Sequence, residues 1–249
     1  MTAMRHRLTA LVGLLLGMAT PGLAAATCRD ITFESLPYTV CEVSTAQDLR
    51  IFHSGGDGAV LGSFGRVDEV LKPEGKKLGF AMNAGMYHAD RAPVGLLVTE
   101  GTEQSRIITS DGPGNFGLLP NGVFCIGPQR FRVVESRAYQ ANPPACRFAT
   151  QSGPMLVIDG ALHPRFLPKS DSRYIRNGVG VSADGKTAYL AISGQAVNFA
   201  QFGRLFRDAL KTPNALYFDG KISRLYAPAL RRNDFGFQMG PIIGLVEAE

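Results

Sequence analysis

The sequence predicts an α+β protein, a single domain with mixed β-sheet and a few packed helices. Short apolar runs recur along the chain and are bounded by glycine, proline, asparagine or aspartate, which is typical of strands. One segment in the C-terminal third repeats its apolar residues with the helical period of 3.6. No repeat, linker or low-complexity tract divides the chain, and about 220 residues after a predicted leader suffice for one substantial core.

Residues 1–26 have the features of a secretory signal peptide. Arginines within residues 5–7 precede an apolar run over residues 8–19, and small residues at 24–26 offer a cleavage site. The apolar run is too short to span a bilayer comfortably, so we expect no stable membrane span after cleavage. The mature chain would then be a domain of residues 27–249 in the periplasm or outside the cell.

The charge of the chain is mildly basic. The formal net charge is +5, and removing the leader, which holds two arginines and no acidic residue, lowers it to +3. No Lys/Arg run and no interleaving of basic with aromatic residues indicates a nucleic-acid groove, so we expect no nucleic-acid partner. This charge supports only a weak attraction to anionic small molecules or envelope polymers.

Four cysteines follow the predicted cleavage point: Cys28, Cys41, Cys125 and Cys146. An even number in an exported protein predicts disulfides, and four cysteines allow three pairings. We favour Cys28–Cys41 with Cys125–Cys146, because each pair flanks a plausible two-strand excursion. Each bridge would stabilise the fold by about 3 kcal/mol by restricting the unfolded chain. The absence of a Cys-x-x-Cys motif disfavours a redox or zinc centre.

Strands are predicted along most of the chain. Apolar runs between turn formers predict them over residues 38–43, 49–52, 80–82, 94–98, 123–126, 131–134, 154–158, 179–182, 188–192, 215–218 and 240–246. Residues 54–58 and 111–115 are rich in glycine with aspartate or asparagine and predict loops. Asp159-Gly160 and Asp184-Gly185 predict tight turns between neighbouring strands.

The clearest helical segment begins at Asn198. This residue predicts an N-cap, with Gln201 as its capping-box partner three positions later. Apolar residues then recur on one face, at Phe199, Phe202, Leu205, Phe206, Ala209 and Leu210. We expect the helix to stop at Thr212, because the residue before Pro213 avoids the helical region.

Asp219 is the acid in the strongest position for chemistry. It follows a strand predicted to be central, and Gly220 lets the backbone turn sharply behind it. A carboxylate at a strand end is held rigidly while its tip reaches a crevice, which suits a nucleophile or a base. Residue types alone nevertheless favour the simpler interpretation, an Asp-Gly turn that only ends the strand.

Two further polar pairs precede predicted strands. Arg176 and Asn177 could receive an anion, since a guanidinium presents a planar fork to phosphate, and the alternative is a surface arginine paired with Asp171. Gln151 and Ser152 are hydrogen-bonding candidates. No Gly-x-Ser-x-Gly elbow surrounds Ser152, so we do not expect it to be a nucleophile.

His88 lies in the polar segment between the apolar runs at 80–82 and 94–98. A lone loop histidine is most often solvated or hydrogen-bonded, and the few other histidines are too scattered for a three-histidine zinc site. No cofactor is predicted. Scattered Asp and Asn oxygens leave a divalent-cation site open, because such sites need no linear signature.

Five motifs, in order, resemble the phosphodiester glycosidase family, which includes the lysosomal uncovering enzyme that removes N-acetylglucosamine from a phosphodiester. They are Asn83-Ala84-Gly85-Met86-Tyr87 with Pro93-Val94-Gly95-Leu96, then Asn121-Gly122-Val123-Phe124, Gln151-Ser152-Gly153-Pro154-Met155-Leu156, Arg176-Asn177-Gly178-Val179-Gly180-Val181, and Asn214-Ala215-Leu216-Tyr217-Phe218-Asp219-Gly220 with Ser223. The similarity extends over roughly residues 75 to 246. Five ordered motifs are far more specific than any one of them.

The resemblance implies a secreted hydrolase that cleaves the sugar–phosphate bond of a glycosyl-1-phosphodiester or an envelope glycan. It implies that Asp219 supplies the carboxylate and Arg176 a phosphate clamp. The implied substrate-binding residues are Asn83, Gly85, His88, Gly95, Gln151, Ser152, Asn177 and Ser223. Asn83 and Gly85 would form the pocket floor, and Gly95 would give close backbone passage.

Two departures bear on specificity. Ala84 stands where the family often has glycine, and Lys221-Ile222 stands where better-known members continue a glycine run. Side chains at these positions would narrow or re-line the crevice, so the resemblance carries over the reaction type but not the N-acetylglucosamine specificity. The chain is most similar to a bacterial branch of unknown function. The alternative is a non-catalytic envelope protein that kept the pocket and binds a glycan or a sugar phosphate.

Overall fold

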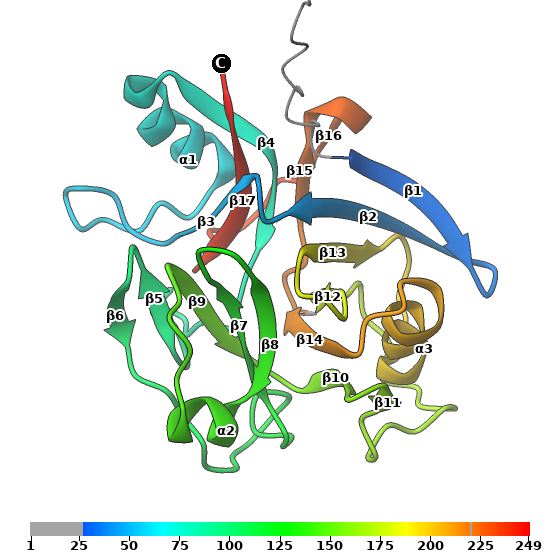
Figure 1. Ribbon diagram of the computed structural model, residues 1–249. Coiled ribbons are helices and arrows are strands. Elements are labelled where there is room, and N and C mark those ends of the chain that lie inside the picture. The colour runs from blue at the N-terminus through cyan, green and yellow to red at the C-terminus, as the bar shows by residue number, and fades with distance from the viewer. Residues whose placement is uncertain (1–26, 220) are drawn as a thin grey trace, which may run out of the picture.

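Three antiparallel sheets surround one core in the computed structural model, which describes residues 27–219 and 221–249 (Figure 1). The predicted signal peptide lies outside the described residues. Strands make up 42% and helices 14% of this single domain, so it is a β-rich α+β protein. The expectation of a mixed sheet is wrong, because every strand pairing in the described residues is antiparallel. Parallel pairing requires long crossovers, whereas many successive strands here are joined by short turns.

The largest sheet has seven strands. In spatial order they are β1 (Thr27–Phe33), β2 (Leu36–Ser44), β13 (Thr187–Ser193), β12 (Asn177–Val181), β14 (Asn214–Asp219), β10 (Met155–Ile158) and β11 (Ala161–Leu162). The predicted turn at Asp159-Gly160 is confirmed, since Ile158 pairs with Ala161 across it. The predicted turn at Asp184-Gly185 joins β12 to β13 in the same way.

The two remaining sheets have five strands each. One consists of β16 (Arg232–Asn233), β15 (Leu225–Ala227), β4 (Lys76–Asn83), β17 (Ile242–Ala248) and β3 (Asp48–Phe52). The other consists of β6 (Thr102–Ser105), β5 (Leu97–Thr99), β9 (Phe148–Ser152), β7 (Gly122–Ile126) and β8 (Phe131–Glu135). A hydrophobic cluster joins all three sheets, with Phe80 from β4, Phe124 from β7 and Leu216 from β14. One continuous core therefore fixes the sheets relative to each other.

The predicted capping box is present at the start of α3 (Phe199–Arg204). Asn198 Oδ1 accepts from the Gln201 N–H at 2.9 Å, and Gln201 Oε1 accepts from the Asn198 N–H at 3.0 Å. The segment then continues as a wider π-helical turn over Leu205–Ala209, and its apolar face packs in one cluster with residues of β2, β10 and β14. The predicted helical segment is thus correct in position, but its second half has a different geometry.

Two α-helices were not predicted. Helix α1 (Phe64–Leu71) begins at Ser63, whose hydroxyl accepts from the Arg66 N–H, and it buries Phe64, Val67 and Leu71 near β4. Helix α2 (Ser136–Ala141) follows β8, and short 3-10 turns occur at Lys72–Glu74 and Pro228–Leu230. Both α-helices are only two turns long, too short for a clear periodic signal. No helix in the described part of the chain is long and apolar enough to cross a membrane.

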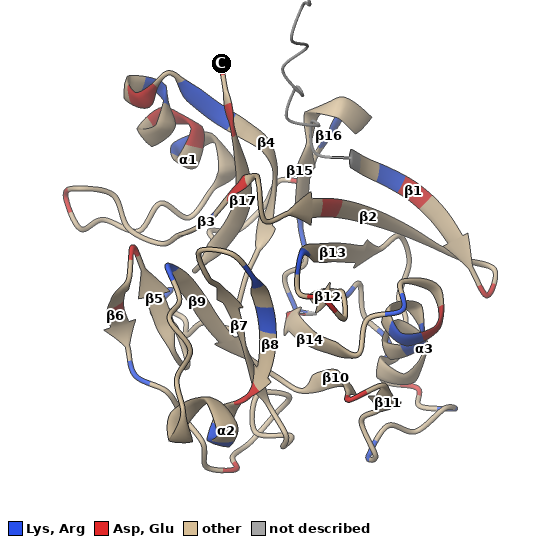
Figure 2. Ribbon diagram, viewed as in Figure 1, with Lys and Arg blue, Asp and Glu red and all other residues tan. Residues whose placement is uncertain are grey.

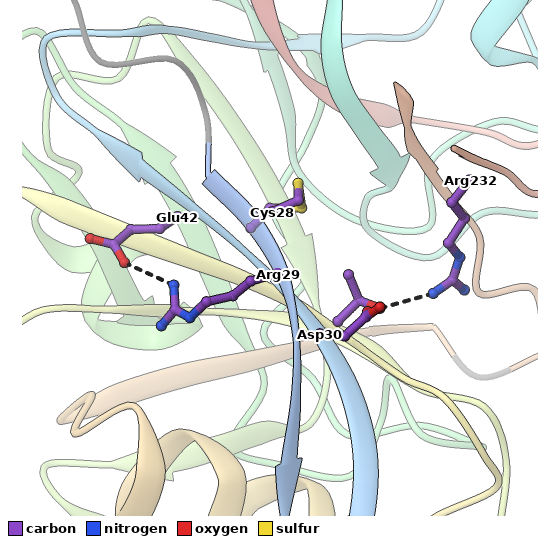
Figure 3. Close-up of a disulfide and its surroundings, with 7 residues drawn as sticks. Cys28, Arg29, Asp30, Glu42 and Arg232 are labelled. Atoms are coloured by element: carbon purple, nitrogen blue, oxygen red, sulfur yellow. Dashed lines mark hydrogen bonds and ion pairs between the residues drawn. A yellow bond between two sulfur atoms is a disulfide. The ribbon is translucent and has the colours of Figure 1, made fainter. Parts of the chain in front are cut away.

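Both favoured disulfides are confirmed. Cys28–Cys41 links β1 to β2, and Cys125–Cys146 links β7 to the segment before β9. Beside the first bridge, Arg29 pairs with Glu42 at 3.4 Å (Figure 3). Two bridges indicate a protein that folds in an oxidising compartment outside the cytoplasm.

Candidate functional site

Strand ends from all three sheets meet around Asp219. This residue ends β14, and Asn177, which begins β12, pairs with it across the sheet. Asn83 ends β4 in the second sheet, and its side-chain amide contacts Asn177. Ser152 ends β9 in the third sheet and donates through Oγ to the Phe218 carbonyl at 2.8 Å. The motifs that lie far apart in the sequence are therefore brought to one place.

Asn177 is the centre of a buried hydrogen-bond network. Its Nδ2 donates to the Asn83 carbonyl at 2.7 Å. Its Oδ1 accepts at 3.2 Å from Asn83 Nδ2, from the Asp219 N–H and from Ser223 Oγ. Asn83 Oδ1 in turn accepts from the Arg224 N–H at 2.9 Å, and both asparagines are fully buried. Because these amides are engaged with protein groups, they hold the backbone on either side of Asp219 in place.

The partly exposed Asp219 side chain is oriented by the turn that follows it. Its Oδ1 accepts from the Lys221 N–H at 2.9 Å, and its carbonyl accepts from Ser223 Oγ at 2.6 Å. Lys221 is exposed, whereas Ile222 packs against the apolar cluster that contains Tyr87. Contacts with Lys221 and Ser223 thus hold Asp219 in place.

Arg176 is fully buried although it carries a charge. Nε donates to the Val197 carbonyl at 2.9 Å and Nη2 to the Ser172 carbonyl at 3.1 Å. The guanidinium carbon lies 3.7 Å from the Phe199 ring centroid, close enough for a strong cation–π contact. The alternative of a surface ion pair with Asp171 is wrong, because Arg176 forms no ion pair within the described residues. Burial lowers the pKa of Arg176.

Polar atoms without partners surround this arginine. Within the described residues, Arg176 Nη1 and the Tyr217 hydroxyl are buried without a well-aligned hydrogen bond, although the two side chains are near enough to shift each other's pKa. The Tyr217 ring centroid lies 5.2 Å from the Arg176 guanidinium carbon. Tyr217 and Asp219 are two residues apart on β14, on either side of an irregularity in its pairing with β12. Burial, and secondly the Asp219 charge, raise the pKa of Tyr217, while Arg176 opposes this. Tyr217 is therefore within electrostatic reach of both Arg176 and Asp219.

Gln151, which precedes Ser152 on β9, has a side chain fully engaged with protein groups. Its Oε1 accepts from the N–H groups of Leu96 and Ile108, both at 3.0 Å. Its Nε2 donates to Ser136 Oγ at 2.8 Å and to the Ile108 carbonyl. Gly95 passes directly against this amide, and no Cβ fits there. The expected close backbone passage at Gly95 is present, and the Gln151 side chain fastens two loops to β9.

The other candidates lie at different depths. The Gly85 N–H donates to Thr150 Oγ1 at 3.2 Å, and a Cβ at Gly85 would meet the Gln151 carbonyl. His88 is exposed on the loop after β4, and only its backbone is seen to hydrogen-bond, through N–H to Ala92 and through the carbonyl to Arg91. The structure directly joins Asn83, Asn177, Asp219 and Ser223, brings Arg176 and Ser152 beside them, and uses Gly85, Gly95 and Gln151 as supporting wall. Substrate contacts by these residues, and by His88, stay predictions.

Sequence reasoning missed three residues near the carboxylate. The Tyr87 hydroxyl is buried without a partner in the described residues, and burial, with the Asp219 charge second, raises the pKa of Tyr87 to about 12. Arg91 and Arg224 oppose this rise, so both guanidinium groups lie within electrostatic reach of the ring. Arg91 lies in the polar segment of the first motif, and Arg224 directly follows Ser223. The signal that could have indicated these residues is their position within or next to a family motif.

Neither metal ligands nor the cavity beside β3 alter this description. No group of three or more His, Cys, Asp or Glu side chains in the described residues is placed to hold a metal ion. A cavity of about 530 Å³ is lined by residues 50–56, Gly58, Thr99, Glu100, Gln104 and Phe148. Neither Asp219 nor Arg176 lines this cavity, so we do not assign it to the candidate site.

The fold and site define a β-rich domain that holds one carboxylate and several arginines at convergent strand ends. The chain belongs to the phosphodiester glycosidase family, whose model matches residues 76–238. YigE of Escherichia coli (strain K12) is 30% identical over 229 residues, which cover 91% of this chain and 87% of that protein. YigE is itself uncharacterized, so it adds no activity.

Two solved structures share the fold. The catalytic domain of zebrafish N-acetylglucosamine-1-phosphodiester alpha-N-acetylglucosaminidase, auto-inhibited by its pro-peptide, has a TM-score of 0.58 at 12% identity. That match covers 91% of this chain and 85% of the zebrafish chain. A Burkholderia pseudomallei protein described as exported has a TM-score of 0.53 at 12% identity, over 84% of this chain and 74% of its own. At such identities the similarity concerns the fold alone.

Proposed function

We propose that this protein is an exported hydrolase that cleaves the sugar–phosphate bond of a glycosyl-1-phosphodiester. The observation that carries the proposal is the carboxylate of Asp219, held where strand ends with the family's motifs meet, with the buried Arg176 on the other side of Tyr217. The two disulfides and the predicted signal peptide support a place outside the cytoplasm.

The chemistry asks little of a general acid. Hydrolysis breaks the bond between the anomeric carbon and the phosphate oxygen, adds water to the sugar, and releases a phosphate monoester. This anion is a good leaving group, so the reaction needs mainly an anion clamp and a carboxylate that stabilises or attacks the oxocarbenium-like carbon. Asp219 supplies the carboxylate in this proposal, and Arg176 supplies the clamp through its unpartnered Nη1.

A buried cation suits this role for an electrostatic reason. Charge interactions are stronger away from water, and a site that is already fixed loses little in reorganisation when the transition state forms. Arg176 is held by two backbone carbonyls and an aromatic face. The partly exposed Ser223 would hydrogen-bond sugar or phosphate, whereas Asn83, Asn177 and Gln151, whose amides bond to protein groups, would hold the site in place.

The test is Asp219→Asn, which keeps the oxygen that accepts from the Lys221 N–H but removes the charge. We expect turnover of sugar-1-phosphodiesters to be abolished while circular dichroism and the melting temperature stay close to wild type. Asp159→Asn is the matched control, since Asp159 also precedes a glycine at the end of a strand but lies at the β10–β11 turn. Retained activity in Asp219→Asn would remove this residue from the mechanism.

A binding protein is the second candidate, because side chains replace the family's glycine run at Lys221-Ile222. The two candidates can be distinguished by incubating the purified protein with the same phosphodiesters. Release of free sugar, measured by chromatography, supports the enzyme. Saturable binding without product, measured by calorimetry, supports the binding protein.

A further inference from the structure

Arg224 is a half-buried cation with no partner. Its N–H bonds to Asn83 in the network, but its guanidinium makes no hydrogen bond or ion pair within the described residues. Burial lowers the pKa of Arg224, which Tyr87 and Asp234 only partly oppose. By contrast, Arg50, Arg147, Arg204, Arg207 and Arg232 each pair with a carboxylate. A partly desolvated charge is costly unless an anion meets it, so Arg224 is suited to an anionic ligand.

Asp219 is within electrostatic reach of two tyrosines, each of which lies near an arginine. Its charge raises the pKa of both Tyr217 and Tyr87. Arg176 opposes this effect at Tyr217, whereas Arg91 and Arg224 oppose it at Tyr87. The Arg91 guanidinium carbon lies 5.6 Å from the Tyr87 ring centroid. On β1 and α1, by contrast, basic residues stand close to acidic ones (Figure 2). A phosphodiester has two non-bridging oxygens, so arginines on two sides can bind one phosphate.

An aromatic loop lies directly on Arg224. A Cβ at Gly236 would be 2.5 Å from Arg224 Nη2, so the backbone at this position rests against the guanidinium. The flanking Phe235 and Phe237 are 94% and 79% exposed, the most exposed of the large apolar side chains in the described residues. The loop is fastened at one end by the Asp234 N–H, which donates to the Leu225 carbonyl at 3.0 Å. The two rings are therefore presented beside a cation at the edge of the proposed site.

Phenylalanine restricts what can occupy this edge. A tyrosine or tryptophan could hydrogen-bond the hydroxyls of a second sugar, whereas phenylalanine has no polar atom to offer. Two exposed phenyl rings next to an unpaired guanidinium match a ligand with an anionic group joined to an apolar chain. Alkyl phosphates have this chemistry.

We propose that Arg224, with Arg91, binds the substrate phosphate from the leaving-group side, and that Phe235 and Phe237 bind an apolar alcohol part. The substrate class is then a glycosyl-1-phosphodiester of a long-chain alcohol. This inference rests on the proposed function and adds no new chemical step. Water cleaves the bond at the anomeric carbon, and the products are the free sugar and the alkyl phosphate.

The apolar part is tested with two probes that share the same glycosyl 1-phosphate and differ only in a methyl or a decyl ester, both below micelle-forming concentration. We expect wild-type kcat/KM to be about tenfold higher for the decyl probe. The ratio should fall to about one in the double variant Phe235→Ala/Phe237→Ala. Leu167→Ala, which removes another exposed apolar side chain, should keep the wild-type ratio. A wild-type ratio of one, or an unchanged ratio in the double variant, overturns the apolar subsite.

The phosphate contact is tested by Arg224→Gln. We expect kcat/KM to fall about 30-fold or more for both probes, chiefly through KM, with partial rescue by Arg224→Lys, because a charged contact is removed and then replaced without its fork. Arg66→Gln on α1 is the surface control. Unchanged kinetics in Arg224→Gln overturn this contact even while the proposed function stands.

Failure of the proposed function is seen separately, as turnover of neither probe by the wild type. In that case, calorimetry compares the binding of decyl phosphate with the binding of inorganic phosphate. Tighter binding of decyl phosphate that weakens in both variants supports the inference, and equal binding of the two anions overturns it. A membrane contact is the other role that the two rings could have. If the phenylalanine double variant no longer adsorbed to anionic vesicles but kept the preference for the soluble decyl probe, the rings would be assigned to that contact and the inference would be overturned.

Discussion

Replacing Asn177 by alanine tests whether the buried network holds the site together. The substitution removes four hydrogen bonds, one donated to the Asn83 carbonyl and three accepted by Oδ1. Two of the partner atoms, the carbonyl and Nδ2 of Asn83, belong to a fully buried residue and would lose this partner. Ser223 keeps its 2.6 Å bond to the Asp219 carbonyl, and the partly exposed Asp219 can reach water.

The expected loss follows from those two atoms. An orphaned buried polar group costs about 1–3 kcal/mol, so the pair predicts a loss of about 2–6 kcal/mol in the free energy of unfolding. For a domain of this size, about 4 kcal/mol corresponds to a fall in Tm of about 8–16 °C. Turnover by the fraction that remains folded should also fall, because Asp219 would lose one of its backbone anchors.

Urea unfolding at constant pH, followed by circular dichroism, measures the loss. Asn214→Ala is the matched control: it removes an asparagine that exchanges two hydrogen bonds with Asp159 on the same sheet, but at an exposed position. Water can replace those bonds, so we expect a cost below about 1 kcal/mol. If Asn177→Ala cost no more than Asn214→Ala, the network would not be what holds the strand ends together.

Two further predictions concern stability. Gly95→Ala should destabilise the protein by about 1–3 kcal/mol, because the new Cβ meets the Gln151 amide, which four hydrogen bonds hold in place. The control is Gly56→Ala, since Gly56 has open space around it, and equal urea midpoints for the two variants would contradict the prediction. Tyr38→Phe should reduce the loss of stability at alkaline pH. Burial first, and the Glu34 charge second, raise the pKa of Tyr38 from 10 to about 12, so the stability that the neutral phenol contributes is present below pH 10 and is lost as pH rises toward 12. That contribution is on the order of 2 kcal/mol, and identical stability curves for variant and wild type between pH 9 and 12 would refute it.

Much of the fold could be predicted because its signals are local. The capping box at Asn198 and the two-strand spans between paired cysteines depend on residues close in sequence. Short elements were missed for the same reason, since α1 (Phe64–Leu71) offers only two turns of periodic pattern. The pairing sense of the strands was also mistaken, because apolar alternation does not record the direction of the neighbouring strand.

The candidate site, too, could be predicted only in part from the sequence. Motif order indicated Asn83, Asn177 and Asp219, and these residues do meet. The pattern could not show that Arg176 would be buried against an aromatic ring, nor that the backbone at Gly236, between two exposed phenylalanines, would rest against Arg224.

By itself, the sequence determined most strand segments, the capped helical segment, the two disulfides and the set of chemically able residues, because each depends on neighbouring residues or on composition. The tertiary structure alone decided which of those residues meet. The Asn83–Asn177 contact joins positions 94 residues apart, and the bond between Asn83 and the Arg224 N–H joins positions 141 apart. Such contacts follow from how three sheets pack on one core, and that packing depends on all the buried side chains together.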